Sequence, residues 1–134
     1  MSKVQDKNNQ KIVVVTGASS GIGRATAFLM AQQGHQVIAT SRHMGKLSPL
    51  LEETRNSGCS IVPEEVNINK SDELERFFER LFEHFGCVDV LINNAGYGLK
   101  GSINTINTQQ LRDQFDTNLF AAISTMKAVL PMMI

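Results

Sequence analysis

The sequence lacks an excess of either charge and contains few cysteines. Thirteen lysine and arginine residues balance thirteen aspartate and glutamate residues, and no basic block or tail stands out. Nucleic acid and anionic membrane surfaces are therefore not favoured as partners, because both select basic surfaces. The two cysteines, Cys59 and Cys87, are not in a C-x-x-C arrangement. They favour a reduced, cytoplasmic compartment over an oxidising one.

A long apolar run is also missing. The first ten residues are polar and lack the apolar core of a signal peptide. The most apolar stretch, residues 119–134, contains Lys127 and Pro131 and is shorter than the ~20 residues that span a bilayer. We expect no membrane segment and interpret this stretch as a buried helix. With 134 residues, the chain is expected to hold one domain over residues 11–134, after a polar lead over residues 1–10.

Short β-branched runs alternate with longer segments of helical period along the chain. The expected strands cover residues 12–15, 36–40, 60–66 and 88–92. The expected helices run from about residue 21 to residue 34, from Pro49 to Gly58, from Ser71 as the N-cap to Gly86, and onward from Thr108. Most strand candidates are continuously apolar, as in a sheet covered on both faces. This alternation predicts an α/β fold with a doubly wound parallel sheet.

Two helices carry apolar stripes at spacings of three and four residues. In the third helix, the stripe is Leu74, Phe77, Phe78, Leu81, Phe82 and Phe85, which we expect to be core. In the fourth helix, one face carries Leu111, Phe115, Leu119, Ile123 and Met126. That helix reaches the last residue without a cap, and the strand over 88–92 would lie at a sheet edge. We therefore expect a truncated domain, with a further strand beside this edge.

A glycine-rich turn follows the first expected strand. The segment Thr16-Gly17-Ala18-Ser19-Ser20-Gly21-Ile22-Gly23 lies between an apolar strand and a helix. Gly17 permits a tight turn, Gly21 lets the main chain approach a pyrophosphate, and Gly23 allows the helix to pack close to the strand. Phosphates then meet the free amides and the positive dipole end of a helix N-terminus. The turn therefore predicts nucleotide binding.

The combined motifs resemble the N-terminal part of the short-chain dehydrogenase/reductase family. Thr16 to Gly23 fits the family's T-G-x-x-x-G-I-G turn, Asn93 to Gly96 fits its N-N-A-G, and Asn118 fits its active-site asparagine. The match is collinear over nearly all of residues 11–134. The resemblance implies a Rossmann fold and hydride transfer between a nicotinamide dinucleotide and a carbonyl or alcohol substrate.

Cofactor choice is decided after the second strand, where a carboxylate would favour NAD. This chain has Ser41 and Arg42 there, so both the resemblance and the charge favour NADP(H). Lys46 is either a further contact or a solvated charge. After the third strand, Asn67 and Ile68 stand where the family has an Asp and an apolar residue that contact adenine. The expected cofactor-binding residues are Gly17, Ser19, Ser20, Gly21, Ile22, Gly23, Ser41, Arg42, Asn67, Ile68, Asn94, Ala95 and Gly96. No metal site is expected, since the three histidines share no ligand spacing.

The family's chemistry also requires a serine and a Y-x-x-x-K pair. The only tyrosine, Tyr97, is followed four residues later by Gly101, so only Asn118 carries over as a catalytic residue. We expect this chain alone to be inactive and a substrate to bind only in a full-length form. One hypothesis is the cofactor-binding part of an NADP(H)-dependent oxidoreductase. The alternative is an inactive nucleotide-binding or dimerisation module that forms a homo-oligomer through the helix over 108–134.

Overall fold

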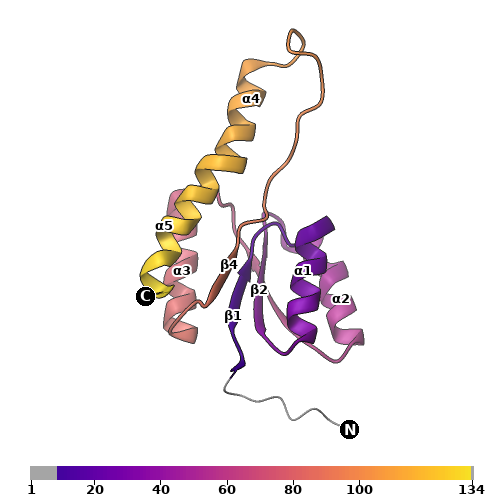
Figure 1. Cartoon of the computed structure of the whole chain (residues 1–134), viewed down its shortest axis with the longest axis vertical. Coiled ribbons are helices and arrows are strands. Elements are labelled where there is room, and N and C mark those ends of the chain that lie inside the picture. Colours follow the sequence, from indigo (N-terminus) through magenta and orange to yellow (C-terminus); the bar gives the residue numbers. More distant parts are fainter. Residues whose placement is uncertain (1–8, 134) are drawn as a thin grey trace.

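A computed structural model describes residues 9–133 of the chain, so most of the expected polar lead and the last residue lie outside the described residues. The elements are β1 (Ile12–Val15), α1 (Gly21–Gln32), β2 (Gln36–Ser41), η2 (Met44–Leu47), α2 (Ser48–Asn56), β3 (Ile61–Glu65), α3 (Ser71–Phe85), β4 (Val90–Ile92), α4 (Thr108–Phe115), η3 (Asp116–Phe120) and α5 (Ala121–Met133). Each expected strand and helix is present (Figure 1). The third and fourth strands are shorter than expected, and β2 is one residue longer.

The four strands form one parallel sheet in the order β3-β2-β1-β4. The chain winds outward from β1 to β3 and then crosses back to place β4 on the other side of β1. The winding therefore reverses between β1 and β4. In open parallel sheets, ligands bind beyond the carboxyl ends of the strands at such a reversal. This order confirms the predicted doubly wound α/β fold.

Both faces of the sheet are covered by helices (Figure 1). Val13 and Val15 of β1 pack in one core cluster with residues of α1 and α2, whereas Val14 packs in a second cluster with residues of α3 and α5. All three valines are fully buried. Successive side chains of a strand point to opposite faces, so a strand covered on both sides must be apolar throughout.

Helix α3 differs from expectation at two positions. Ser71 is its first helical residue, and the N-cap is Lys70, which makes no side-chain capping hydrogen bond. Leu74, Phe77, Phe78 and Leu81 are buried as expected, but Phe82 is 50% exposed. Assigning Phe82 to the core was wrong, because the buried face of α3 is narrower than its apolar stripe. The helix ends at Gly86 as expected, with a left-handed φ of 77°.

The helix expected from Thr108 is two α-helical segments joined by one π-helical turn, η3. Helix α5 packs on the core through Ala121, Thr125 and Val129. The opposite side is apolar yet exposed, so the expectation of a buried helix was wrong for that face. The expected apolar face, formed by Leu111 and Phe115 of α4, Leu119 of η3, and Ile123 and Met126 of α5, is 37–51% exposed. Successive helical residues lie about 100° apart, which puts Ile123 about 200° from Thr125.

Within residues 9–133, no helix combines the length and the apolar character needed to cross a bilayer.

Candidate functional site

The N-terminus of α1 presents unused backbone donors at the end of β1. Ser20 is the N-cap residue, and its side chain makes no capping hydrogen bond. The Arg24 N–H donates to the Ser20 carbonyl, 3.2 Å away. The amides before Arg24 therefore have no helical acceptor. No acidic residue lies in the first turn of α1, so no carboxylate of that turn would compete with a bound anion for these donors and the helix dipole.

Two glycines of the turn are required for different reasons. Gly17 has a φ of 64°, and a Cβ there would lie 2.7 Å from the Ala95 Cα. Gly21 has a φ of 57°, but a Cβ there would meet no atom within 4 Å. Gly17 therefore allows the close approach of two loops, whereas Gly21 leaves an open surface beside the helix N-terminus.

Thr16 joins the loops that follow β1 and β4. Its Oγ1 accepts hydrogen bonds from the backbone N–H groups of Asn94 and Ala95, both at 3.1 Å. The Asn94 side chain in turn donates from Nδ2 to the Gly17 carbonyl at 3.0 Å. At Gly23, a Cβ would overlap this Asn94 amide and the Gly17 carbonyl. Gly23 thus serves the packing of α1 against the turn.

A groove of about 520 Å³ lies across these strand ends. It brings together eleven of the thirteen expected cofactor-binding residues, namely Gly17, Ser19, Ser20, Gly21, Ile22, Ser41, Arg42, Ile68, Asn94, Ala95 and Gly96. Gly23 lies behind its wall, and Asn67 lines a neighbouring cavity of about 350 Å³. The groove thus spans the glycine-rich turn, the end of β2 and the end of β4.

The end of β2 supplies polar groups and positive charge to the groove. Ser41 is 8% exposed, and its Oγ accepts from the His43 N–H at 3.3 Å. Arg42 is exposed and, among residues 9–133, makes no ion pair. Lys46 in η2 also lines the groove. An exposed guanidinium without an acidic partner is available to bind a phosphate.

The side chain of Asn118 is held by the loop after β4. Its Oδ1 accepts from the Tyr97 N–H at 2.9 Å, and its Nδ2 donates to the Tyr97 carbonyl at 2.7 Å. A Cβ at Gly96 would lie 2.9 Å from the Asn118 Oδ1, so a glycine leaves room for this contact. Asn118 lies in η3, where the Ala121 N–H donates to the Asp116 carbonyl. It does not line the groove.

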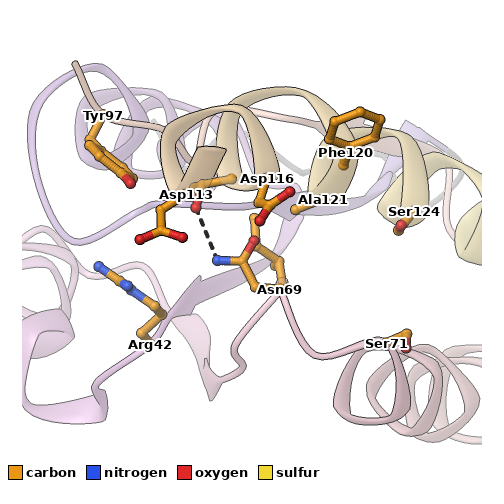
Figure 2. A pocket seen from close by; sticks show the side chains of 11 residues that line it. Arg42, Asn69, Ser71, Tyr97, Asp113, Asp116, Phe120, Ala121 and Ser124 are labelled. Carbon is orange, nitrogen blue, oxygen red and sulfur yellow. Dashed lines mark hydrogen bonds between the residues drawn. The ribbon is translucent and has the colours of Figure 1, made fainter. Parts of the chain in front are cut away.

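A second cavity of about 750 Å³ adjoins the groove (Figure 2). Arg42, Ile68, Asn69, Tyr97 and Thr117 line both spaces. Sequence reasoning missed Asn69 and Thr117 as site residues, together with the groove-lining Thr40, His43 and Val66. Each lies within two residues of an expected site residue, and that proximity was the only signal for them.

Asp89, Cys59 and Cys87 do not line the groove. Asp89 pairs with the start of β1, because its Oδ2 accepts from the Ile12 N–H at 2.7 Å. Cys59 and Cys87 are both half-buried free thiols. In the part of the chain that the structure describes, no group of three or more histidine, cysteine or acidic side chains is arranged to hold a metal ion.

The doubly wound sheet and the groove at its reversal define a nucleotide-binding α/β protein of the Rossmann type. Residues 11–134 match the family model described as short chain dehydrogenase. The chain therefore belongs to the short-chain dehydrogenase family.

Individual relatives agree with this assignment over nearly the whole chain. A 3-ketodihydrosphingosine reductase from Bacteroides thetaiotaomicron is 35% identical, with 92% of this chain and 42% of that protein aligned. The structure of a protein from Burkholderia xenovorans assigned to the same family has a TM-score of 0.88 and 34% identity, covering 92% of this chain and 49% of that one. A metagenomic short-chain oxidoreductase in complex with NADP has a TM-score of 0.85 and 31% identity, covering 92% and 56%. The chain spans about half the length of the curated relatives it matches.

Proposed function

We propose that this chain is the NADP(H)-binding part of a short-chain oxidoreductase. The observation that carries the proposal is the position of Ser41 and Arg42 at the end of β2, in one groove with the N-terminus of α1. Within residues 9–133, Arg42 makes no ion pair. The Ser41 hydroxyl can donate to a phosphate oxygen, and the Arg42 guanidinium can pair with a 2′-phosphate in a bidentate manner. The related metagenomic oxidoreductase that was crystallised with NADP also supports NADP(H) as the cofactor.

The residues along the groove suit successive parts of such a cofactor. The pyrophosphate would lie over Gly21 and Ile22, where the amides of α1 are free. Lys46 adds positive charge near the 2′-phosphate. Ala95 and Gly96 would line the path to the nicotinamide end. Ile68 would give apolar contact to the adenine, and Asn67 would support its loop from the neighbouring cavity. The bound cofactor would supply a hydride for exchange with a carbonyl or alcohol.

Catalysis requires more than these residues. Asn118 is the one residue of the family's catalytic set that this sequence matches, and both atoms of its amide bind the Tyr97 backbone. Tyr97 has glycine rather than lysine four residues later. We therefore expect binding without turnover by residues 1–134, with substrate chemistry in a longer chain. NADPH-dependent reduction of a panel of carbonyl compounds by this chain, well above background, would contradict that expectation.

Calorimetric titration of the chain with NADPH and with NADH tests the cofactor assignment. Arg42→Ala should weaken NADPH binding by about tenfold to a hundredfold, the size of a lost charge-assisted pair, and should hardly change NADH binding. Lys100→Ala is the matched control, because Lys100 is an exposed cation that does not line the groove. An equal loss of affinity for NADPH and NADH would contradict the assignment of NADP(H) as the cofactor. A folded parent chain that binds neither cofactor would contradict the proposed function.

A second candidate function is association through the exposed apolar face of α4 and α5. Seven residues on it are each at least 37% exposed, namely Leu111, Phe115, Leu119, Ile123, Met126, Leu130 and Met133. Contiguous apolar surface of this kind marks interaction sites in proteins. Sedimentation should show concentration-dependent self-association that Phe115→Ser weakens and Leu29→Ser, on the exposed face of α1, does not. A monomer at all concentrations would exclude this function.

A further inference from the structure

The segment after β2 is held by a carboxylate from the neighbouring strand. Glu65 is the last residue of β3 and is paired in register with Ser41, the last residue of β2. Its Oε2 accepts a hydrogen bond from the Met44 N–H at 2.8 Å. Met44 begins η2, and the N-cap residue of η2, His43, makes no side-chain capping hydrogen bond. Glu65 therefore caps η2 from another strand, in place of a residue of the segment itself.

The segment that Glu65 caps carries the groups proposed to bind the 2′-phosphate. Ser41, Arg42 and Lys46 line the groove. Glu65 does not line the groove, but it lines the neighbouring cavity of about 350 Å³ together with Arg42. Figure 2 shows the Arg42 side chain reaching into the cavity that adjoins the groove. Glu65 thus binds the backbone of this segment from outside the groove in which the cofactor would lie.

The other hydrogen bonds of this segment are local. The Ser41 Oγ accepts from the His43 N–H at 3.3 Å, and the His43 carbonyl accepts from the Lys46 N–H at 3.1 Å. Within residues 9–133, the hydrogen bond from Met44 to Glu65 is the only one that joins residues 42–46 to another element. The position of this segment relative to β3 therefore depends on the Glu65 carboxylate.

We propose that Glu65 is a positioning residue for binding of the cofactor's 2′-phosphate. Its carboxylate holds residues 42–46 in the conformation in which Arg42 and Lys46 line the groove. A segment that is ordered before binding loses less conformational entropy when the phosphate binds. If the ordered conformation were only partly populated, the apparent affinity would fall with that population. The proposal rests on the proposed function, because it assigns a positioning residue to the same cofactor site.

The charge of Glu65 acts in the opposite direction to its hydrogen bond. A carboxylate near the phosphate-binding segment repels the 2′-phosphate, so removing the charge alone should strengthen NADPH binding slightly. Removing the hydrogen bond should weaken NADPH binding. The two effects have opposite signs, and a pair of variants can therefore separate them.

The test compares two substitutions at this position. Glu65→Gln removes the charge and keeps a carbonyl oxygen that can accept from the Met44 N–H, whereas Glu65→Ala removes both. In calorimetric titrations, Glu65→Ala should bind NADPH about three- to tenfold more weakly than Glu65→Gln, the effect of about one hydrogen bond. The affinities of the two variants for NADH should agree within about twofold, because NADH has no 2′-phosphate.

Glu64 provides the matched control. It precedes Glu65 in β3, pairs with Arg80 at 3.4 Å, and lines neither the groove nor the neighbouring cavity. Glu64→Ala and Glu64→Gln should therefore bind NADPH equally. If Glu65→Ala fails to fold, Glu65→Asp is compared with the parent chain. This variant keeps the charge but is one methylene shorter, and it should weaken the binding of NADPH and not that of NADH.

Three results would overturn the proposal. Equal NADPH affinity of Glu65→Ala and Glu65→Gln, or of Glu65→Asp and the parent chain where the alanine variant does not fold, would show that the hydrogen bond does not support phosphate binding. An equal loss for NADPH and NADH would show a general effect on the fold. In both cases the proposed function stands. If the folded parent chain binds neither NADPH nor NADH, the proposed function fails, and this inference fails with it.

Discussion

The Thr16 hydroxyl offers the sharpest test of how the site is built. Thr16 is 1% exposed, and its Oγ1 accepts hydrogen bonds from the N–H groups of Asn94 and Ala95. The substitution Thr16→Val keeps the shape of the side chain and removes the acceptor. Two half-buried backbone donors at the end of β4 would then lose their partner.

The magnitude follows from the number of donors. Leaving a buried donor unsatisfied costs about 1–3 kcal/mol. The open groove lets water reach these two amides in part, so we expect the lower end of that range for each. Thr16→Val should therefore lower the free energy of unfolding by about 2–4 kcal/mol. Thr16→Ser keeps the acceptor and loses one methyl group, which costs about 1 kcal/mol.

Urea denaturation followed by far-UV circular dichroism measures the difference, since the chain contains no tryptophan for fluorescence. The midpoint should fall further for Thr16→Val than for Thr16→Ser, at an unchanged slope. A valine variant as stable as the serine variant would show that these hydrogen bonds do not hold the two loops together.

Three further outcomes are expected. Gly17→Ala should lower the melting temperature more than Gly21→Ala, because both have positive φ but only the first would place a Cβ 2.7 Å from backbone; similar losses would refute this. Phe78→Ala should cost about 3–5 kcal/mol in urea denaturation and Phe82→Ala less than about 1, because only the former is buried. The backbone N–H of the next residue lowers the pKa of Asp72 below its usual 3.8 in the folded chain. Its contribution to stability is present above the unfolded-state pKa and is lost as the pH falls through the folded value. Asp72→Asn should therefore lose less stability than the parent between pH 5 and pH 3, and equal losses in urea midpoint would contradict this.

Local physics accounts for the parts of the fold and site that the sequence predicted. A run such as Ile12 to Val15, apolar at every position, suits a strand covered on both faces. The strand, the glycine-rich turn and the helix are contiguous, so their order alone predicted a phosphate-binding helix end. Of the eleven expected cofactor-binding residues that line the groove, five belong to this turn, and the other six lie at or after the ends of β2, β3 and β4.

Expectations about which surfaces are covered were less successful. Phe82 and Phe115 lie on apolar stripes, and periodicity identifies a stripe without showing what lies against it. The buried face of α5 is formed by smaller residues such as Ala121 and Thr125, which let the helix approach the core closely. Side-chain size at the contact, rather than hydrophobicity, separates the two faces.

The sequence by itself determined the alternation of strands and helices, the phosphate-binding turn and the positive charge after the second strand, because each depends on residues close together in the chain. Only the tertiary structure decided that Asn69 rather than Asn67 lines the groove, and that Thr117 holds it. The physical reason is that a hydrogen bond between residues 48 positions apart depends on where the π-helical turn of η3 lies relative to the loop between β3 and α3. Neither residue spacing nor composition predicts that Asn69 and Thr117 lie within hydrogen-bond distance.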